Sequence, residues 1–254
     1  MFEQNSLKDR VVLCTGASSG IGQRMAQTLA LAGASVFLVA RREERLVKAV
    51  EEIQTNKNNG AVSFSIDLSK TGSLEALYQR CCEKLGPPDI LVNAAGVNFR
   101  EDWETISMDS WNSTIYLNLS IPFFLAQKCV PEMIKRGWGR IINIASLQSY
   151  RAFPNGLAYG ASKGGIAQVT RGMAEAWSRS GVTANAIAPG FFPTDLTEPV
   201  FKDSAKSDHN AKMTAIGRNG VMSDLDGITV FLASKESDYI TGQIINVDGG
   251  YSAK

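Results

Sequence analysis

The sequence predicts an α/β fold in which a doubly wound parallel sheet of about seven strands carries helices on both faces. Three observations lead to this prediction. Short runs of consecutive apolar residues, such as VVLCT at 11–15, are typical of strands that are buried on both faces of a parallel sheet. Segments with the apolar spacing of helices alternate with these runs. The length of 254 residues suits one domain of this type, and a single domain over residues 1–254 is expected.

The first half of the chain is expected to contain three strand–helix units and a fourth strand. Gly33 ends the first helix, the polar segment NKNNG ends the second, and Pro87 and Pro88 end the third. The predicted strands cover residues 11–15, 35–40, 62–66 and 89–93, and the predicted helices cover 21–32, 43–56 and 69–85.

The second half of the chain begins with a long helical pattern, which Pro122 and Pro131 should bend or divide. Residues 191–222 lack a clean period and are predicted to form a mobile cover over the site. The predicted helices cover 109–135, a segment starting at Leu157, and 224–232, and the predicted strands cover 140–145, 182–188 and 243–247.

The composition excludes several classes of function. The net charge of +1 gives no reason to expect a nucleic acid or a membrane as partner. The first ten residues lack the apolar core of a signal peptide, and no apolar run is long enough to span a bilayer, so a cytoplasmic protein is expected. The four cysteines are predicted to be thiols, and with His209 as the single histidine no metal site is expected.

Ser146, Tyr159 and Lys163 form a candidate catalytic group. A predicted strand ends at Ser146, and Tyr159 and Lys163 lie one turn apart on the following helix, so their side chains share a face. A nearby ammonium group stabilises a phenolate and lowers the pKa of the phenol, which would make Tyr159 a usable general acid or base. Ser146 could donate a hydrogen bond to a substrate oxygen on which charge develops.

Gly16, Gly20 and Gly22 form a GxxxGxG turn between the first predicted strand and the first predicted helix. Such a turn lets the backbone approach a pyrophosphate, whose charge is bound by the amide groups at the start of the helix. The position that meets the adenosine ribose, at the end of the second strand, is held by Arg41 and Arg42. Arginine accommodates a 2′-phosphate, so NADP(H) is the expected cofactor, and NAD(H) stays open as an alternative.

The same turn also matches the G-x-S-x-G nucleophile elbow of serine hydrolases, with Ser18 as the nucleophile. Asp195 and His209 follow Ser18 in the order that a hydrolase triad would need. This alternative lacks an HGGG-type oxyanion segment and leaves the tyrosine–lysine pair without a role. A non-catalytic nucleotide-sensing protein is a third alternative, because a fold alone does not establish catalysis.

Together, the motifs TGASSGIG, NAAG and PGFFPT and the spacing of Ser146, Tyr159 and Lys163 resemble the short-chain dehydrogenase/reductase family along essentially the whole chain. The resemblance implies that Ser146 polarises a carbonyl, that Tyr159 transfers the proton and that Lys163 binds the nicotinamide ribose. Asn118 would complete this group through a water relay to the lysine. The resemblance also implies a set of cofactor-binding residues: Gly16, Ser18, Ser19, Gly20 and Ile21 for the pyrophosphate and adenosine, Asp67 and Leu68 beside the adenine, Asn93, Ala94 and Gly96 beside the ribose, and Pro189, Gly190 and Thr194 at the nicotinamide amide.

The substrate is expected to be a small molecule carrying a carbonyl or alcohol group. The chain looks most like gluconate 5-dehydrogenase-like members of the family, which act on sugar acids and polyols, with 3-oxoacyl thioester reductases as the alternative. The family resemblance implies a homo-oligomer, either a tetramer or a dimer. The residues expected to line the substrate pocket are Asn98, Gln148, Tyr150, Phe153, Phe192 and Leu196.

Overall fold

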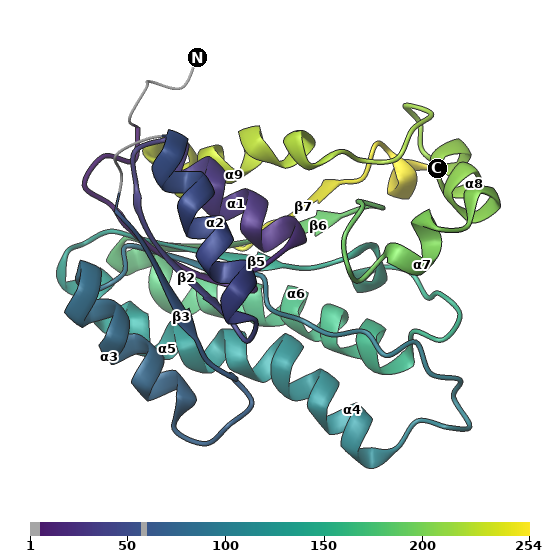
Figure 1. The fold of residues 1–254 in the computed structure, drawn as a ribbon, viewed down its shortest axis with the longest axis horizontal. Helices are drawn as coiled ribbons and strands as arrows, with labels where there is room; N and C mark the ends of the chain where they lie inside the picture. Colours follow the sequence, from purple (N-terminus) through teal and green to yellow (C-terminus); the bar gives the residue numbers. More distant parts are fainter. Residues whose placement is uncertain (1–5, 57–59) are drawn as a thin grey trace.

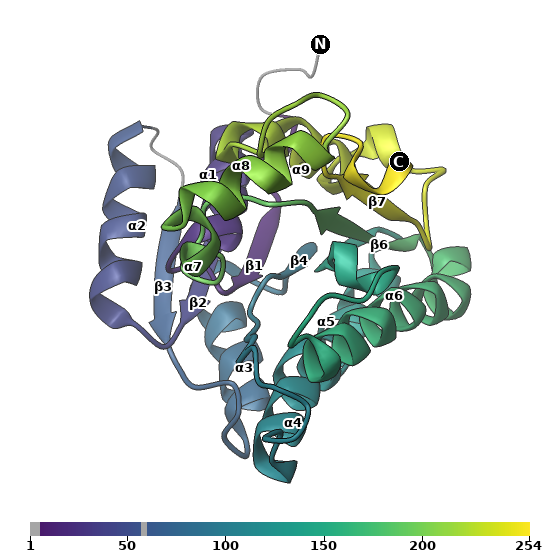
Figure 2. The ribbon, with the colours of Figure 1, turned by 90° about the vertical axis from the view of Figure 1, so that its right-hand side faces the viewer.

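The protein forms one seven-stranded parallel sheet with helices on both faces, as predicted (Figures 1 and 2). The structure is a computed structural model that describes residues 6–56 and 60–254. Two predictions fall partly outside this range: the one on the polar N-terminus, whose first five residues are not described, and the one on the NKNNG segment after the second helix, of which residues 57–59 are not described. Along the sheet the strands follow the order β3-β2-β1-β4-β5-β6-β7.

The observed strands agree with the predicted ones to within one or two residues at each end. They are β1 (Val11–Thr15), β2 (Ser35–Ala40), β3 (Ala61–Ser65), β4 (Ile90–Asn93), β5 (Gly139–Ile144), β6 (Val182–Pro189) and β7 (Ile244–Val247). The helices are α1 (Gly20–Leu31), α2 (Glu43–Asn56), α3 (Ser73–Leu85), α4 (Met108–Ile115), α5 (Ile121–Lys135), α6 (Leu157–Trp177), α7 (Glu198–Phe201), α8 (Ser204–Met213) and α9 (Asp226–Ala233).

Two hydrophobic clusters lie on opposite faces of the sheet, which explains why the strands are apolar without alternation. Within β1, Val12 and Cys14 belong to one cluster, whereas Leu13 belongs to the other. Helices α1, α2 and α9 cover the first face, and α3, α5 and α6 cover the second (Figure 2). The inner strands, such as β1 and β4, therefore need apolar side chains in both directions.

The predicted helix over 109–135 is present but is divided in a way that the sequence did not indicate. A π-helical turn, Tyr116–Ser120, separates α4 from α5. Pro122 stands in the first turn of α5, and Pro131 lies inside α5 without ending it. Because proline has no N–H and its ring crowds the carbonyl group four residues earlier, the wider turn accommodates Pro122. That carbonyl group belongs to Asn118.

The segment 191–222 contains two short helices, α7 and α8, that the sequence reading missed. The side chain of Asp203 caps α8 by accepting a hydrogen bond from the backbone N–H of Lys206 at 3.1 Å. Only Asn210 is buried along α8, so this helix has no apolar stripe that a periodicity search could detect. Among the described residues, no helix is long and apolar enough to cross a membrane.

The parallel arrangement brings the carboxyl ends of all seven strands to one edge of the sheet. Chain order along the sheet reverses between β1 and β4, where the segments that follow Thr15 and Asn93 lie side by side. In open α/β sheets, ligands bind in the crevice beside such a reversal. The fold therefore places a ligand crevice next to the glycine turn.

Candidate active site

A cleft of about 1480 Å³ opens at the carboxyl edge of the sheet. Its walls come from the glycine turn after β1, the segments after β4 and β5, the start of α6, and the segment after β6. Most of the residues singled out in the sequence line it: Gly16, Ser18, Ser19, Gly20, Ile21, Arg41, Arg42, Asp67, Leu68, Ala94, Gly96, Asn98, Ser146, Gln148, Phe153, Tyr159, Lys163, Pro189, Gly190, Phe192, Thr194 and Leu196.

Ser146, Tyr159 and Lys163 converge at the centre of this cleft. Ser146 follows β5 and forms a hydrogen bond with the phenol of Tyr159. The ammonium Nζ of Lys163 lies 5.5 Å from the centre of the Tyr159 ring and donates a hydrogen bond to the carbonyl oxygen of Ile144 at 2.6 Å. The strand end thus supplies both the serine and the acceptor that holds the lysine.

Burial controls the ionisation of this group. It raises the pKa of Tyr159 above its ordinary value, and the hydrogen bond with Ser146 and the positive charge of Arg100 oppose the rise. Burial also lowers the pKa of Lys163 to about 8. The expected lowering of the Tyr159 pKa by Lys163 is therefore not found here, because desolvation outweighs it and the ammonium is directed at a backbone carbonyl.

Ser149 connects the two halves of the catalytic group. The backbone N–H of Ser146 donates to Ser149 Oγ at 3.3 Å, and this hydroxyl donates to the carbonyl oxygen of Lys163 at 2.7 Å. Ser146 Oγ in turn accepts the backbone N–H of Gln148 at 3.1 Å. The end of β5 is thereby fixed against α6, and the sequence reading had assigned no role to Ser149.

Asn118 lies behind the cleft wall, in the π-helical turn. Its side-chain oxygen accepts a hydrogen bond from the backbone N–H of Val97, and its side-chain NH₂ donates one to the carbonyl oxygen of Val97, each at 2.9 Å. It also donates to Ser162 Oγ at 3.0 Å. A Cβ atom on Gly96 would lie 3.1 Å from Asn118 Oδ1. The side chain of Asn118 therefore positions the segment after β4.

The glycine turn is built to let a ligand approach the backbone. Gly16 and Gly20 have positive φ angles of 68° and 58°. A Cβ atom on Gly22 would lie 2.5 Å from the carbonyl oxygen of Gly16, so no other residue fits there without a shift. Ser19 precedes α1 without capping it through its side chain, which leaves the first amide groups of the helix available to an anion.

Arg41 and Arg42 lie at the end of β2, next to the glycine turn. Arg41 is exposed; hydrogen bonds from Ser69 lower the pKa of Asp67, and the charge of Arg41 adds to this effect. Arg42 donates to Ser18 Oγ at 3.2 Å and to Ser19 Oγ at 2.7 Å. Two guanidinium groups and two hydroxyl groups thus surround the corner of the cleft that was predicted to hold an adenosine 2′-phosphate.

Two residues predicted to contact a ligand lie elsewhere. Asn93 is buried between the sheet and a helix, and its amide donates to Asn143 Oδ1 at 2.9 Å rather than toward the cleft. Tyr150 donates its hydroxyl to the carbonyl oxygen of Ile244 at 3.3 Å, beside β7. In both cases, the sequence motif placed the residue close to the cleft along the chain. Long-range packing, however, turns the side chain to a partner outside the cleft.

Arg100 is a cleft residue that the sequence reading missed. It lies in the loop after β4 with a positive φ of 56°, and its guanidinium group donates to the carbonyl oxygen of Leu196 at 3.1 Å. Its charge acts on Tyr159, as described above. No periodicity or motif marks a residue in such a loop, so only the structure reveals that a cation shares the cleft with the reactive tyrosine.

The lysines of segment 191–222 are mostly engaged in local ion pairs. Lys202 pairs with Glu198 at 2.8 Å, and Lys206 pairs with Asp203 at 3.1 Å. Lys206 and His209 also line the cleft, and the role of the segment as a mobile cover stays a prediction.

The hydrolase alternative fails on geometry. Ser18 accepts a hydrogen bond from Arg42, and Asp195 binds Arg42, Arg45 and Ser19, so neither side chain is paired with His209 among the described residues. Across the same part of the chain, all four cysteines are free thiols, and histidine, cysteine and carboxylate side chains form no cluster that could hold a metal ion.

Comparison with known proteins adds independent findings. Residues 16–252 match the family model described as enoyl-(acyl carrier protein) reductase. The chain is 39% identical over 247 residues to gluconate 5-dehydrogenase of Gluconobacter oxydans (strain 621H), covering 96% of this chain and 95% of that protein. It is 37% identical over 249 residues to 2-dehydro-3-deoxy-D-gluconate 5-dehydrogenase of Bacillus subtilis (strain 168), covering 98% and 97%.

A solved structure is similar along its full length. The gluconate 5-dehydrogenase of Burkholderia cenocepacia J2315, in complex with NADP and tartrate, superimposes with a TM-score of 0.93 at 36% identity, covering 100% of this chain and 99% of that one.

Proposed function

This chain belongs to the short-chain dehydrogenase/reductase family, and on that basis we propose that it interconverts a secondary alcohol and a ketone on a sugar acid, with NADP(H) as cofactor. The observation that carries the proposal is the convergence of Ser146, Tyr159 and Lys163 beside a glycine turn in one cleft. The named relatives act on gluconate or a dehydro-deoxygluconate, and the similar solved structure holds NADP and tartrate.

The residues of the cleft fit a phosphorylated dinucleotide. The uncapped start of α1 and the glycine turn would hold the pyrophosphate, and Arg41 and Arg42 would hold the 2′-phosphate. Asp67 and Leu68 would lie beside the adenine, and Pro189, Gly190 and Thr194 beside the nicotinamide amide. When bound, the cofactor supplies or accepts the hydride.

The catalytic residues provide a proton and a hydrogen bond. Because burial raises the pKa of Tyr159, the phenol is protonated at neutral pH and can donate its proton to the oxygen of a ketone substrate. Ser146 can donate a hydrogen bond to the same oxygen as negative charge develops on it. Lys163, held by the carbonyl oxygen of Ile144 one helical turn from Tyr159, would bind the nicotinamide ribose of the cofactor.

Two features of the cleft support a hydroxylated, anionic substrate. Arg100 places a positive charge near Tyr159, where it could bind a carboxylate. Oε1 of Gln148 is buried in the cleft wall without a hydrogen-bond partner among the described residues, and a substrate hydroxyl could supply the missing donor. The acyl chain of a long thioester carries neither a carboxylate for Arg100 nor a row of hydroxyl groups for Gln148.

The proposal is tested by following the loss of reduced-nicotinamide absorbance. NADPH and NADH are compared in parallel, with 5-ketogluconate and with an acetoacetyl thioester as substrates. The proposal predicts that 5-ketogluconate is reduced with NADPH at a higher kcat/KM than with NADH, and that the thioester reacts more slowly. Faster turnover of the thioester would instead assign the protein to 3-oxoacyl reduction, and a preference for NADH would contradict the cofactor assignment.

We also propose that the protein forms a homo-oligomer. Exposed apolar side chains, including Met108, Tyr116 and Phe124, lie along α4, the π-helical turn and α5. A second copy of the chain would cover such a surface, in a dimer or a tetramer. Light scattering should give a mass of two or four chains, and a monomer would contradict this part of the proposal. The cytoplasmic location stays a prediction from the sequence.

A further inference from the structure

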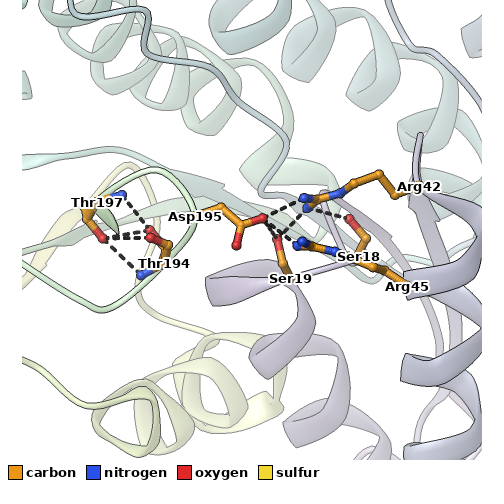
Figure 3. A network of polar contacts seen from close by, with 7 residues as sticks. All are labelled: Ser18, Ser19, Arg42, Arg45, Thr194, Asp195 and Thr197. Atoms are coloured by element: carbon orange, nitrogen blue, oxygen red, sulfur yellow. Dashed lines mark hydrogen bonds and ion pairs between the residues drawn. The ribbon is translucent and has the colours of Figure 1, made fainter. Parts of the chain in front are cut away.

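A carboxylate from the segment after β6 binds at the corner of the cleft where the cofactor's 2′-phosphate is proposed to lie. Asp195 Oδ2 lies 2.6 Å from Nη1 of Arg42 and 2.7 Å from Nη1 of Arg45 (Figure 3). The hydroxyl of Ser19 donates to the same oxygen at 3.2 Å. The guanidinium groups of Arg42 and Arg45 hold the pKa of Asp195 below its ordinary value, so the carboxylate is charged at neutral pH.

The turn that carries Asp195 is ordered by its own hydrogen bonds. Thr194 and Thr197, which flank Asp195 in the turn, are joined by hydrogen bonds between their hydroxyl and backbone groups. The distances of these bonds lie between 2.9 and 3.3 Å (Figure 3). The hydroxyl of Thr197 also donates to the carbonyl oxygen of the buried Phe192. A Cβ atom on Gly20 would lie 3.1 Å from the side chain of Thr194, so this turn packs directly against the glycine turn.

We propose that Asp195 is a residue that determines cofactor specificity, because it acts as an internal anion that competes with the cofactor's 2′-phosphate for Arg42. This inference rests on the proposed NADP(H) function. A 2′-phosphate carries more negative charge than a carboxylate and has three acceptor oxygens, so it displaces Asp195 from the guanidinium group. A nucleotide that lacks this phosphate leaves the ion pairs of Asp195 intact. Asp195 thus sets how strongly the site prefers the phosphorylated cofactor.

The competition also reaches the catalytic half of the cleft. The residue after Asp195, Leu196, accepts a hydrogen bond from Arg100 through its carbonyl oxygen at 3.1 Å. The short turn from Thr194 to Thr197 therefore joins the phosphate corner to the cation that faces Tyr159. If a 2′-phosphate displaced the carboxylate of Asp195, the movement of this turn would shift the carbonyl group of Leu196 to which Arg100 donates.

The test measures binding of cofactor fragments by titration calorimetry at low ionic strength. Adenosine 2′,5′-bisphosphate and adenosine 5′-monophosphate are compared on the wild-type protein and on Asp195→Asn, which keeps the size of the side chain and removes its charge. An exposed ion pair of this kind corresponds to up to about fivefold in affinity. We expect Asp195→Asn to bind the bisphosphate about fivefold more tightly, with binding of the monophosphate unchanged and with the gain shrinking as salt is added.

Asp208→Asn is the matched control, because Asp208 is exposed on α8 in the same segment and does not line the cleft. This control should leave both affinities unchanged. An unchanged ratio in Asp195→Asn would overturn the inference. Weaker binding of the bisphosphate would also overturn it, because Asp195 would then orient Arg42 for the phosphate instead of competing with it.

Arg42→Gln separates the inference from the proposed function. If this variant loses the preference for the bisphosphate while Asp195→Asn leaves it unchanged, the cofactor assignment stands and only the role of Asp195 fails. If the wild-type protein and both variants show no preference between the two fragments, the assignment of NADP(H) fails, and the role of Asp195 fails with it.

Discussion

Burial raises the pKa of Tyr159 and keeps a proton on the phenol at neutral pH, although the hydrogen bond with Ser146 opposes this rise. Replacement by Phe removes the proton and leaves the ring in place. We predict that Tyr159→Phe lowers kcat for ketone reduction by at least about 100-fold, in the range typical of a lost general acid, while the Kd for NADPH changes little.

The matched control for this prediction is Tyr239→Phe, which makes the same change at a fully exposed tyrosine. Steady-state rates and NADPH fluorescence titration on the two variants provide the measurements. Retention of full activity in Tyr159→Phe would remove the mechanism proposed for the cleft.

Lys163 links the site to stability through its pKa. Burial lowers that pKa from 10.5 to about 8, so between these values the unfolded chain binds a proton that the folded protein does not. The contribution of Lys163 to stability is therefore fully present above pH 10.5 and is lost as the pH falls to about 8. A shift of this size corresponds to about 3 kcal/mol.

We predict that the difference in unfolding free energy between the wild-type protein and Lys163→Met moves in favour of the wild type as the pH rises from about 8 to 10.5. Denaturant melts of both proteins across this range measure the difference. Because buried thiols such as Cys14, whose pKa is raised, also respond to alkaline pH, the comparison with Lys163→Met isolates the lysine. A pH-independent difference would show that Lys163 is not desolvated in the folded protein.

At the scale of single elements, the glycine turn is the part of the site with the least tolerance for change. A Cβ atom on Gly22 would lie 2.5 Å from the carbonyl oxygen of Gly16, whereas a Cβ on Gly172, in the middle of α6, meets no atom within 4 Å. We predict that Gly22→Ala lowers stability by about 1–3 kcal/mol and weakens NADPH binding. Gly172→Ala should raise stability by about 0.5–1 kcal/mol and leave binding unchanged.

Thermal denaturation and NADPH titration of the two glycine variants check this prediction. Equal behaviour of Gly22→Ala and Gly172→Ala would mean that the turn can relax around a side chain, and the close approach of backbone to pyrophosphate would lose its structural basis.

The sequence predicted most elements because several strands, such as β1 and β2, are nearly continuous apolar runs, and glycine or proline closes many of the helices. It missed α7 and α8 because these helices bury almost no apolar surface and are held by a cap and ion pairs. It expected Pro122 and Pro131 to bend or divide the helix over 109–135. The helix is divided by a π-helical turn just ahead of Pro122, whereas Pro131 lies inside α5 without ending it. Apolar patterns in the sequence therefore predict strands that are buried on both faces better than they predict helices that are held by polar contacts.

At the scale of the whole molecule, the sheet topology explains how much of the site was predictable. The motifs that lie at strand ends, such as the glycine turn and Ser146, come together because a parallel sheet brings those ends to one edge. Arg100 and the partners of Asp195 were not predictable, since they depend on how long loops fold back across that edge. Asn93 and Tyr150 do not line the cleft for the same reason, because the direction of a side chain depends on the assembled core.

The central claim is that hydride passes between NADPH and the ketone of a sugar acid in this cleft. The most direct measurement follows deuterium from NADPH that carries it at the transferring position, with 5-ketogluconate as substrate and mass spectrometry of the product. The account predicts one deuterium per molecule of the hydroxy acid formed by the wild-type protein, and formation of this labelled product at least about 100-fold more slowly with Tyr159→Phe. A hydroxy acid without deuterium, or 5-ketogluconate that stays unreduced after incubation with protein that binds NADPH, would contradict it.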